Sequence, residues 1–391
     1  MGLPKVPPIA IIGAGPSGLL LARLLELDHI DYVVFERDDS ATWNDDERPS
    51  SSGTLDIHKG SGQAALKEGG LLGEFQSIAR YDVPTRICDS QGNVCVEFSE
   101  NDKPEVDRAD LRKLLLASIP AARVRWGCKI ERVERNLDGT VSIYRSDGQV
   151  ESGFRLVVGA DGAWSKVRNL VTTARPQYSG THFFTTLIKT HNAIYTSVAT
   201  MVENGNYLAL EKGRQIFLHY LADGSHHLSV GVKLPETWSA KPTTAGTHNS
   251  LSLWQSVLQS EFCEWDEKPA GLVIKCCSSD QPFRSWPLYT LSADAVPWES
   301  CSGVTLLGDA AHLTIPSGDG VNNALQDSVE LARQIVKHGV NGLDSAVREY
   351  EETMFPRAAK AIEKGQWYLE HFFGADTPET FLQAVGTHDD T

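Results

Sequence analysis

The glycine-rich run from Gly13 to Gly18 lies between two apolar segments and is the feature that most constrains how this chain can fold. Residues 9–12 are apolar, and residues 19–25 favour a helix because none of them is β-branched. In a strand–turn–helix unit, Gly13 permits the tight turn, Gly15 lets the backbone approach a diphosphate, and Gly18 lets the helix pack on the strand. With Pro16 and Ser17 at the helix start, free N–H groups face the phosphates. The run therefore predicts an adenine-dinucleotide site.

A carboxylate follows at the spacing that such a site requires. A second apolar segment, residues 32–35, ends at Glu36, which lies 18 residues after Gly18. A carboxylate at about this distance accepts hydrogen bonds from the ribose hydroxyls of the dinucleotide. The pattern supports a dinucleotide site but does not distinguish NAD from FAD.

Two later segments each place an aspartate at the end of an apolar strand. Residues 156–158 lead into Asp161, and residues 304–307 lead into Gly308 and Asp309. The carboxyl ends of strands are where α/β sheets bind ligands. A helix predicted over residues 320–336 would point its N-terminus at the same place.

With these three motifs in this order, the sequence resembles the single-component, FAD-dependent aromatic hydroxylases, the class A flavoprotein monooxygenases. Within that class, residues 53–63, 107–112 and 265–267 resemble the tetracycline-inactivating monooxygenases. The resemblance implies an α/β fold. It would comprise a Rossmann-like FAD-binding domain of the glutathione-reductase type, a β-sheet substrate domain and a C-terminal bridging helix.

The resemblance also implies roles for individual residues. Glu36 would hold the adenosine ribose, Arg37 would lie beside the adenine or the phosphates, and Arg108 would reach the flavin or its ribityl chain. Asp56 would touch FAD, and Asp309 would bind the ribityl hydroxyls. The backbone N–H groups of residues 318–322 would face the flavin pyrimidine, where a helix N-terminus favours negative charge. The residues expected to bind FAD are Gly13, Gly15, Pro16, Ser17, Gly18, Glu36, Arg37, Asp56, Arg108, Asp161, Gly308, Asp309, Gly318, Gly320, Val321 and Asn322. Arg48 is a candidate contact for NADPH.

The sequence departs from the family pattern at three positions. Asp319 stands where the family usually has Gln, in a loop with fewer residues between Pro316 and Gly320. An acid close to flavin opposes an anionic reduced ring unless it turns to solvent. A Gln and an Arg contact the drug in the tetracycline-inactivating group, and here Thr185 and Tyr207 align with them.

The positions of the motifs predict the domain organisation. The FAD-binding domain would be discontinuous, with residues 1–76, 98–178 and 281–341. Residues 77–97 and 179–280 would form the substrate domain, and residues 342–391 the C-terminal helix and tail. Alternating apolar residues at 228–234 predict a strand of a sheet lying over the flavin, as do residues 216–221 and 193–201. Residues 343–373 have a helical pattern.

Composition excludes several other classes of protein. The net charge is −15, which argues against nucleic-acid binding, and no apolar run reaches the 18 or so residues that a membrane span needs. The seven cysteines include no Cys-x-x-Cys pair, and the start of the chain has no apolar signal segment. We therefore expect a cytoplasmic monomer without a metal site.

Several residues that could carry chemistry are given structural roles instead. His226 and His227 are interpreted as a solvated turn, and Cys276 and Cys277 as packing residues of a strand. His312 is interpreted as a structural hydrogen-bonding residue, and residues 242–247 as a surface loop.

The resemblance implies a function in which the cofactor carries the chemistry and no protein residue is catalytic. NADPH or NADH would reduce FAD, and O₂ would form a flavin hydroperoxide that hydroxylates an electron-rich aromatic or polycyclic phenol or enol. A tetracycline-type compound is among the candidates. Thr185, Tyr207, Phe217, His219 and Pro316 are the candidate substrate contacts. Two alternatives stay open: an FAD-dependent oxidase or dehydrogenase on the same fold, and a flavin- or ligand-binding protein without turnover.

Overall fold

A parallel β-sheet forms the centre of the dinucleotide-binding half in this computed structural model, which describes residues 6–41, 53–238, 256–277, 284–374 and 376–386. Its five strands run in the order β17-β11-β1-β2-β7, and all neighbours are parallel. The strands are β1 (Ile9–Ile12), β2 (Tyr32–Phe35), β7 (Val124–Arg125), β11 (Leu156–Gly159) and β17 (Val304–Leu306). The strands β1, β2, β11 and β17 are buried along most of their length, as expected for a sheet covered on both faces.

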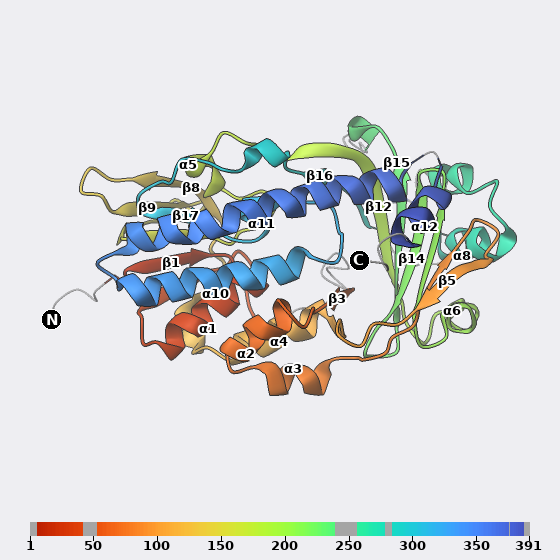
Figure 1. Cartoon of the computed structure of the whole chain (residues 1–391), viewed down its shortest axis with the longest axis horizontal. Helices are drawn as coiled ribbons and strands as arrows, with labels where there is room; N and C mark the ends of the chain where they lie inside the picture. Colours follow the sequence, from red (N-terminus) through yellow and green to blue (C-terminus); the bar gives the residue numbers. More distant parts are fainter. Residues whose placement is uncertain (1–5, 42–52, 239–255, 278–283, 375, 387–391) are drawn as a thin grey trace.

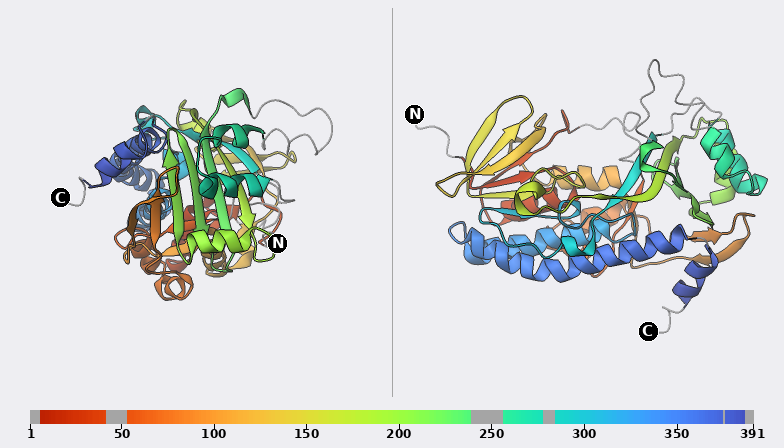
Figure 2. Two further views of the ribbon diagram at one scale, coloured as in Figure 1. Left: turned by 90° about the vertical axis from the view of Figure 1, so that its right-hand side faces the viewer. Right: turned by 90° about the horizontal axis from the view of Figure 1, so that it is seen from above.

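Helices cover one face of this sheet and a small antiparallel sheet lies on the other side (Figures 1 and 2). The helices are α1 (Pro16–Leu27), α2 (Gly62–Glu68), α3 (Leu72–Ile78), α4 (Arg108–Ala117) and α10 (Gly320–His338). The small sheet contains β8 (Ile130–Arg135), β9 (Val141–Arg145) and β10 (Val150–Phe154). Short helices α5 (Arg168–Val171) and α9 (Asp309–His312) follow β11 and β17, and β3 (Thr54–Asp56) pairs with β6 (Glu105–Asp107).

A second, mostly antiparallel sheet stands at the other end of the molecule (Figure 1). Its order is β16-β12-β15-β14-β13-β4-β5. The strands are β4 (Thr85–Cys88), β5 (Val94–Phe98), β12 (Gln177–Ile188), β13 (Asn206–Glu211), β14 (Arg214–Tyr220), β15 (His226–Lys233) and β16 (Arg284–Thr290). Helices α6 (Tyr195–Val202) and α8 (Glu267–Cys277) pack on its outer face through a cluster that includes Val198, Phe262 and Val273.

One long helix joins the two halves. Helix α11 (Leu343–Phe372) packs against α10 near its start and contacts the large sheet near its end, before the short α12 (Glu379–Gly386). Figure 2 shows it running from the dinucleotide-binding half to the large sheet. The predicted fold class, including the C-terminal bridging helix, is confirmed. No helix among the described residues is long and apolar enough to cross a bilayer.

Several local predictions are wrong. Residues 193–201 read as a strand because β-branched residues alternate there, yet residues 195–201 belong to α6, with Val198 and Val202 buried one helical turn apart. Cys276 and Cys277 end a helix, not a strand. His226 and His227 are buried in β15 and do not form a solvated turn. Residues 242–247 and Arg48 lie outside the described residues.

Candidate active site

A cavity of about 620 Å³ lies where the carboxyl edge of the parallel sheet meets the inner face of the large sheet. It joins the two groups of residues that the sequence singles out. From the expected FAD set, its walls include Gly15, Pro16, Ser17, Asp56, Arg108, Asp309, Gly318, Gly320 and Val321; from the expected substrate set, they include Thr185, Phe217, His219 and Pro316. The lining residues do not include Gly13, Gly18, Glu36, Arg37, Asp161, Gly308, Asn322 or Tyr207.

The three glycines of the N-terminal run have different surroundings. Gly13 has φ = +108°, and a Cβ there would overlap the carbonyl oxygen of Ala160. A Cβ on Gly18 would overlap the carbonyl oxygen of Gly13. A Cβ on Gly15 would meet nothing within 4 Å. Gly13 and Gly18 therefore allow close backbone packing, whereas Gly15 leaves open space at the cavity wall.

Glu36 holds the glycine turn through its carboxylate. One carboxylate oxygen accepts a hydrogen bond from the Ala14 N–H at 2.6 Å and the other from the Asp38 N–H at 3.0 Å. Arg112 from α4 donates to the carbonyl oxygen of Ala14 at 2.9 Å and to the Asp38 carboxylate at 3.2 Å. Sequence reasoning gave Arg112 no role of its own, although it lies in the motif at 107–112. Arg37 is exposed at the end of β2.

A buried arginine joins the two later motifs. Asp161 accepts a hydrogen bond from the Lys166 N–H at 2.7 Å, and burial raises the pKa of its carboxyl. Arg168, only 2% exposed, donates to the carbonyl oxygens of Ala163, Asp309 and Ala310, each at 2.7 Å. Arg168 thus fixes the backbone of the second motif from the first, a role that the sequence did not reveal.

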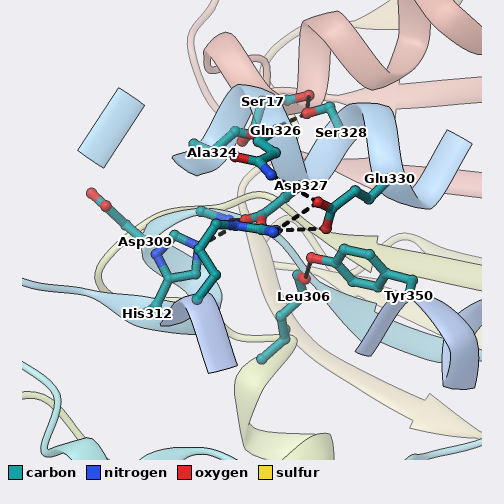
Figure 3. Close-up of polar contacts among 12 residues, drawn as sticks. Ser17, Leu306, Asp309, His312, Ala324, Gln326, Asp327, Ser328, Glu330 and Tyr350 are labelled. Atoms are coloured by element: carbon teal, nitrogen blue, oxygen red, sulfur yellow. Dashed lines mark hydrogen bonds and ion pairs between the residues drawn. The ribbon is translucent and has the colours of Figure 1, made fainter. Parts of the chain in front are cut away.

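The turn at Gly308 rests on a buried ionic network (Figure 3). The fully buried carboxylate of Asp327 accepts hydrogen bonds from the Gly308 N–H at 2.8 Å and from Arg357 at 2.7 Å, and lies 2.7 Å from Nε2 of His312. Burial opposes ionisation of Asp327, but His312 and Arg357 outweigh it and hold its pKa below the usual range. The predicted structural role of His312 is confirmed.

Asn322 ties the start of α10 to β3. Its amide donates to the carbonyl oxygens of Asp56 at 2.8 Å and Gly318 at 3.1 Å, and its oxygen accepts the His58 N–H at 2.8 Å. This arrangement keeps the Asp56 side chain at the cavity wall. Burial, with help from Glu105, Glu100 and Asp319, raises the pKa of Asp56 to about 7 against the opposing charge of Lys103.

The raised pKa of Asp56 predicts a pH-dependent stability. In the unfolded chain the Asp56 carboxyl loses its proton above the ordinary pKa near 4, whereas in the folded protein without FAD it keeps the proton up to about pH 7. The contribution of Asp56 to the free energy of unfolding therefore falls as pH rises from about 4 to 7. We expect Asp56→Asn to have a higher free energy of unfolding than the wild type, and this difference should be about 2 kcal/mol larger at pH 8 than at pH 5. Urea unfolding of the FAD-free protein at both pH values measures this. Asp28→Asn, at an exposed helix end, is the control. An equal dependence of stability on pH for the two substitutions would contradict the assignment of Asp56.

Asp319, the residue that departs from the family pattern, is paired. Its carboxylate forms an ion pair with Lys364 of α11 and lies 3.5 Å from Nδ1 of His58. Helix α11 approaches this loop closely because Gly365 leaves room for Thr314, which a Cβ would strike. The negative charge at this position is therefore offset by a cation from the bridging helix, which lies 45 residues later in the chain (364 − 319).

The inner face of the large sheet supplies the rest of the cavity wall, with every second residue facing inward. On β13, Asn206 and Leu208 line the cavity. Tyr207 between them packs on the opposite face with Cys88 and Val198, so the prediction that it contacts substrate is corrected. On β14, Phe217 and His219 face inward as predicted. His227 also lines the cavity.

Arg108 extends into the cavity from the start of α4. Protein surrounds the Arg108 side chain, but the cavity itself leaves it accessible to solvent. Among the described residues, none forms a hydrogen bond or an ion pair with its guanidinium. Burial lowers the pKa of Arg108, and the charge of Asp309 acts in the opposite direction. No group of three or more metal-ligating side chains occurs among the described residues.

The fold and the cavity define a dinucleotide-binding α/β protein with a sheet-walled ligand pocket. The chain belongs to the family described as the FAD binding domain, whose model matches residues 7–250 and 283–365. The expected resemblance to class A flavoprotein monooxygenases, with FAD as the cofactor, is thereby confirmed.

Named relatives extend over nearly the whole chain. It is 29% identical to monooxygenase penA of Penicillium thymicola, over 91% of this chain and 93% of the relative. It is 28% identical to 3-amino-4-hydroxybenzoate 2-monooxygenase of Streptomyces cremeus, over 95% and 89%. The structure of Klebsiella pneumoniae HpxO complexed with FAD and uric acid has a TM-score of 0.76 at 22% identity, covering 96% of this chain and 92% of that one.

Proposed function

We propose that this chain is an FAD-dependent, NAD(P)H-consuming monooxygenase that hydroxylates an electron-rich aromatic or polycyclic substrate. The observation that carries the proposal is the single cavity that joins the open side of Gly15 to the inner face of the large sheet. A cofactor held along the first wall would meet a substrate held on the second. The named relatives, which are monooxygenases, support this reading.

The residues present fit FAD. The open space at Gly15 suits a diphosphate. Within the described part of the chain, Arg108 offers a cation without a partner, and α10 begins at Gly320 without a side-chain cap on its N–H groups. Asp309 would accept hydrogen bonds from the ribityl hydroxyls. The chemistry that FAD supplies when bound is the transfer of two electrons from NADPH or NADH to O₂, with one oxygen atom inserted into the substrate.

The protein's own part is to bind, orient and shield. We propose that Glu36, Arg112 and Arg168 hold the backbone on which the cofactor rests, because each is hydrogen-bonded to a main-chain group of the motifs. Aromatic side chains of the cavity, among them Phe183, Phe217 and Trp286, would keep water from the reacting carbon.

Phe217 provides a test of the substrate wall. Because an aromatic side chain that is buried against a ligand contributes about 1.5–3 kcal/mol, we expect Phe217→Ala to raise KM roughly tenfold or more and to leave FAD bound. Substrate-stimulated NADPH oxidation measures KM, and flavin absorbance measures cofactor content. Tyr207→Phe, on the other face of the sheet, is the matched control and should change neither. Unchanged kinetics in Phe217→Ala would place the substrate elsewhere.

The function itself is tested on the purified yellow protein in air-saturated buffer. We would follow NADPH oxidation with tetracycline and with a panel of phenols, and then determine the product masses. A gain of one oxygen atom supports the proposal. A loss of two hydrogen atoms would indicate the oxidase or dehydrogenase alternative, and bound FAD without stimulated oxidation by any compound would favour a binding protein. A protein that cannot be reconstituted with FAD would refute the proposal.

We also propose a division into domains along the predicted boundaries, with one adjustment. Strand β16 pairs with β12, so residues 284–290 join residues 77–97 and 179–280 in the substrate domain. We further propose that the protein acts as a cytoplasmic monomer. The free cysteines, such as the exposed Cys95, support this location because a reducing compartment keeps thiols free.

A further inference from the structure

A row of polar side chains crosses the inner face of the large sheet. In the register of the strands, His227 of β15 is the partner of His219 on β14, and Asn206 of β13 is the partner of Thr85 on β4. All four side chains line the cavity. We call these four residues the polar row.

The polar row contains hydrogen-bonding atoms that the described residues leave without a partner. Both ring nitrogens of His227, Nδ1 of His219 and Oδ1 of Asn206 have no hydrogen-bond partner among the described residues. His227 is 7% exposed and Asn206 is 4% exposed. Buried polar atoms are nearly always hydrogen-bonded in folded proteins, so atoms left unpaired on a cavity wall indicate that a ligand supplies the partner.

The polar row carries no net charge near neutral pH. Burial lowers the pKa of His219 to about 3, with His227 and Arg80 acting in the same direction. Burial lowers the pKa of His227 to about 4, with help from Arg108. Both imidazoles are therefore neutral, and each can donate one hydrogen bond and accept another.

Three of the four described Lys and Arg side chains that line the cavity are paired with acids. Arg80 pairs with Asp107 at 2.7 Å and with Glu105 at 3.4 Å. At the cavity wall towards α11, Lys103 pairs with Glu100 and Lys364 pairs with Asp319. Among the described residues that line the cavity, Arg108 is the one Lys or Arg without an acidic partner, and we have proposed that it faces FAD.

Apolar side chains lie beside the polar row on the same face. Phe217, Leu208 and Ile87 are partners across β14, β13 and β4, and Phe183 is the partner of Trp286 across β12 and β16. The rings of Phe217 and His219 lie 3.8 Å apart between centroids. The cavity wall therefore changes from hydrogen-bonding to aromatic side chains between two successive inward-facing residues of β14.

We infer that the substrate is an uncharged ring compound whose hydroxyl, amide or carbonyl edge meets the polar row, and that aromatic carboxylates are rejected. The inference rests on the proposed function and names the class of substrate for that site. A carboxylate would lose its hydration beside neutral imidazoles and compensated cations, with Glu105 close by. An uncharged edge would satisfy the unpaired atoms without that penalty.

The test compares matched ligands on the FAD-loaded, full-length protein. The pairs are 4-hydroxybenzoate with 4-hydroxybenzamide, salicylate with salicylamide, and a hydroxyquinoline carboxylic acid with its carboxamide. Dissociation constants come from the change in flavin absorbance at neutral pH. We expect the amide of each pair to bind at least about tenfold more tightly than the acid, about 1.4 kcal/mol. Acids that bind as tightly as their amides would overturn the inference.

Two variants test the origin of the preference. Glu105→Gln leaves Arg80 with one acidic partner and should narrow the difference between acid and amide. Glu97→Gln removes an exposed acid that pairs with Arg86 on β4 and should leave the difference unchanged. The FAD content of each variant reports whether it is folded. If folded Glu105→Gln shows the same difference in affinity between acid and amide as the wild type, the charge of Arg80 is not what Glu105 compensates, and this part of the inference is wrong.

A measurement without ligand decides the charge of the polar row independently. In ¹⁵N spectra of histidine-labelled protein, His219 and His227 should stay neutral down to about pH 5, and His219→Asn and His227→Asn identify their signals. Titration of either imidazole near pH 6 or above would overturn the inference even if no ligand pair binds. Conversely, tighter binding of amides without stimulated NADPH oxidation by any bound compound would leave the inference standing and refute the proposed function.

Discussion

Replacement of Gly15 by valine is expected to give a folded protein that does not retain FAD. The backbone at Gly15 is extended, with φ = −80° and ψ = 177°, a conformation that valine adopts readily. A Cβ there meets no heavy atom within 4 Å, so the fold has room for the side chain. The space that valine fills is the space proposed for the diphosphate. We expect FAD affinity to fall about 100-fold or more, or roughly 2.7 kcal/mol.

The comparison with Gly13 makes this prediction specific. Gly13→Ala places a side chain at φ = +108° and against the carbonyl oxygen of Ala160, so this variant should lose thermal stability even without FAD. Gly15→Val should keep the melting temperature of the FAD-free wild type. Flavin absorbance per chain and thermal unfolding measure the two effects separately. A yellow Gly15→Val protein would show that the diphosphate does not lie at this turn.

Asp327→Asn is expected to cost about 3–5 kcal/mol of the free energy of unfolding, because it removes the carboxylate that the buried His312 and the half-buried Arg357 share. Asp327 is fully buried and holds Gly308, His312 and Arg357 together. The turn at Gly308 carries Asp309, so FAD affinity should fall as well. Urea unfolding of the FAD-free variant measures the loss of stability without any contribution from the cofactor.

A matched variant and the pH dependence support this interpretation. Glu330→Gln removes a carboxylate that also pairs with Arg357 but is partly exposed, so we expect a cost of about 1 kcal/mol or less. The pKa of Asp327 is lowered on folding, so its contribution to stability is present above its ordinary pKa near 4 and is lost as pH falls further. Equal costs for the two substitutions would mean that the ionic network does not hold the turn.

The sequence predicted the elements whose pattern is local. The glycine run, the two aspartates at strand ends and the helical period of residues 343–373 all lie within short segments, and the structure has a strand, turn or helix at each. The cavity residues Phe217 and His219 follow from the alternation of one strand. These features need no knowledge of what packs against them.

The parts that could not be predicted depend on contacts between distant segments. Arg168 binds carbonyl groups about 140 residues later, and Asp327 finds Arg357 on another helix. The pairing of Asp319 with Lys364 requires α11 to cross the loop. The side of the sheet that Tyr207 faces depends on the register of β13, because a shift of one residue in a strand moves a side chain to the opposite face.

Helix α11 has a consequence for how the molecule can move. Its 30 residues correspond to a rod of about 45 Å, whose first half is buried against the helical layer and whose end packs against the large sheet through Tyr368 and Phe372. A rod shared by both halves resists rotation of one half about the other, and it couples their unfolding into one cooperative transition. We therefore expect substrate entry to rely on local displacement of segments that α11 does not hold, more than on a hinge between two independent lobes.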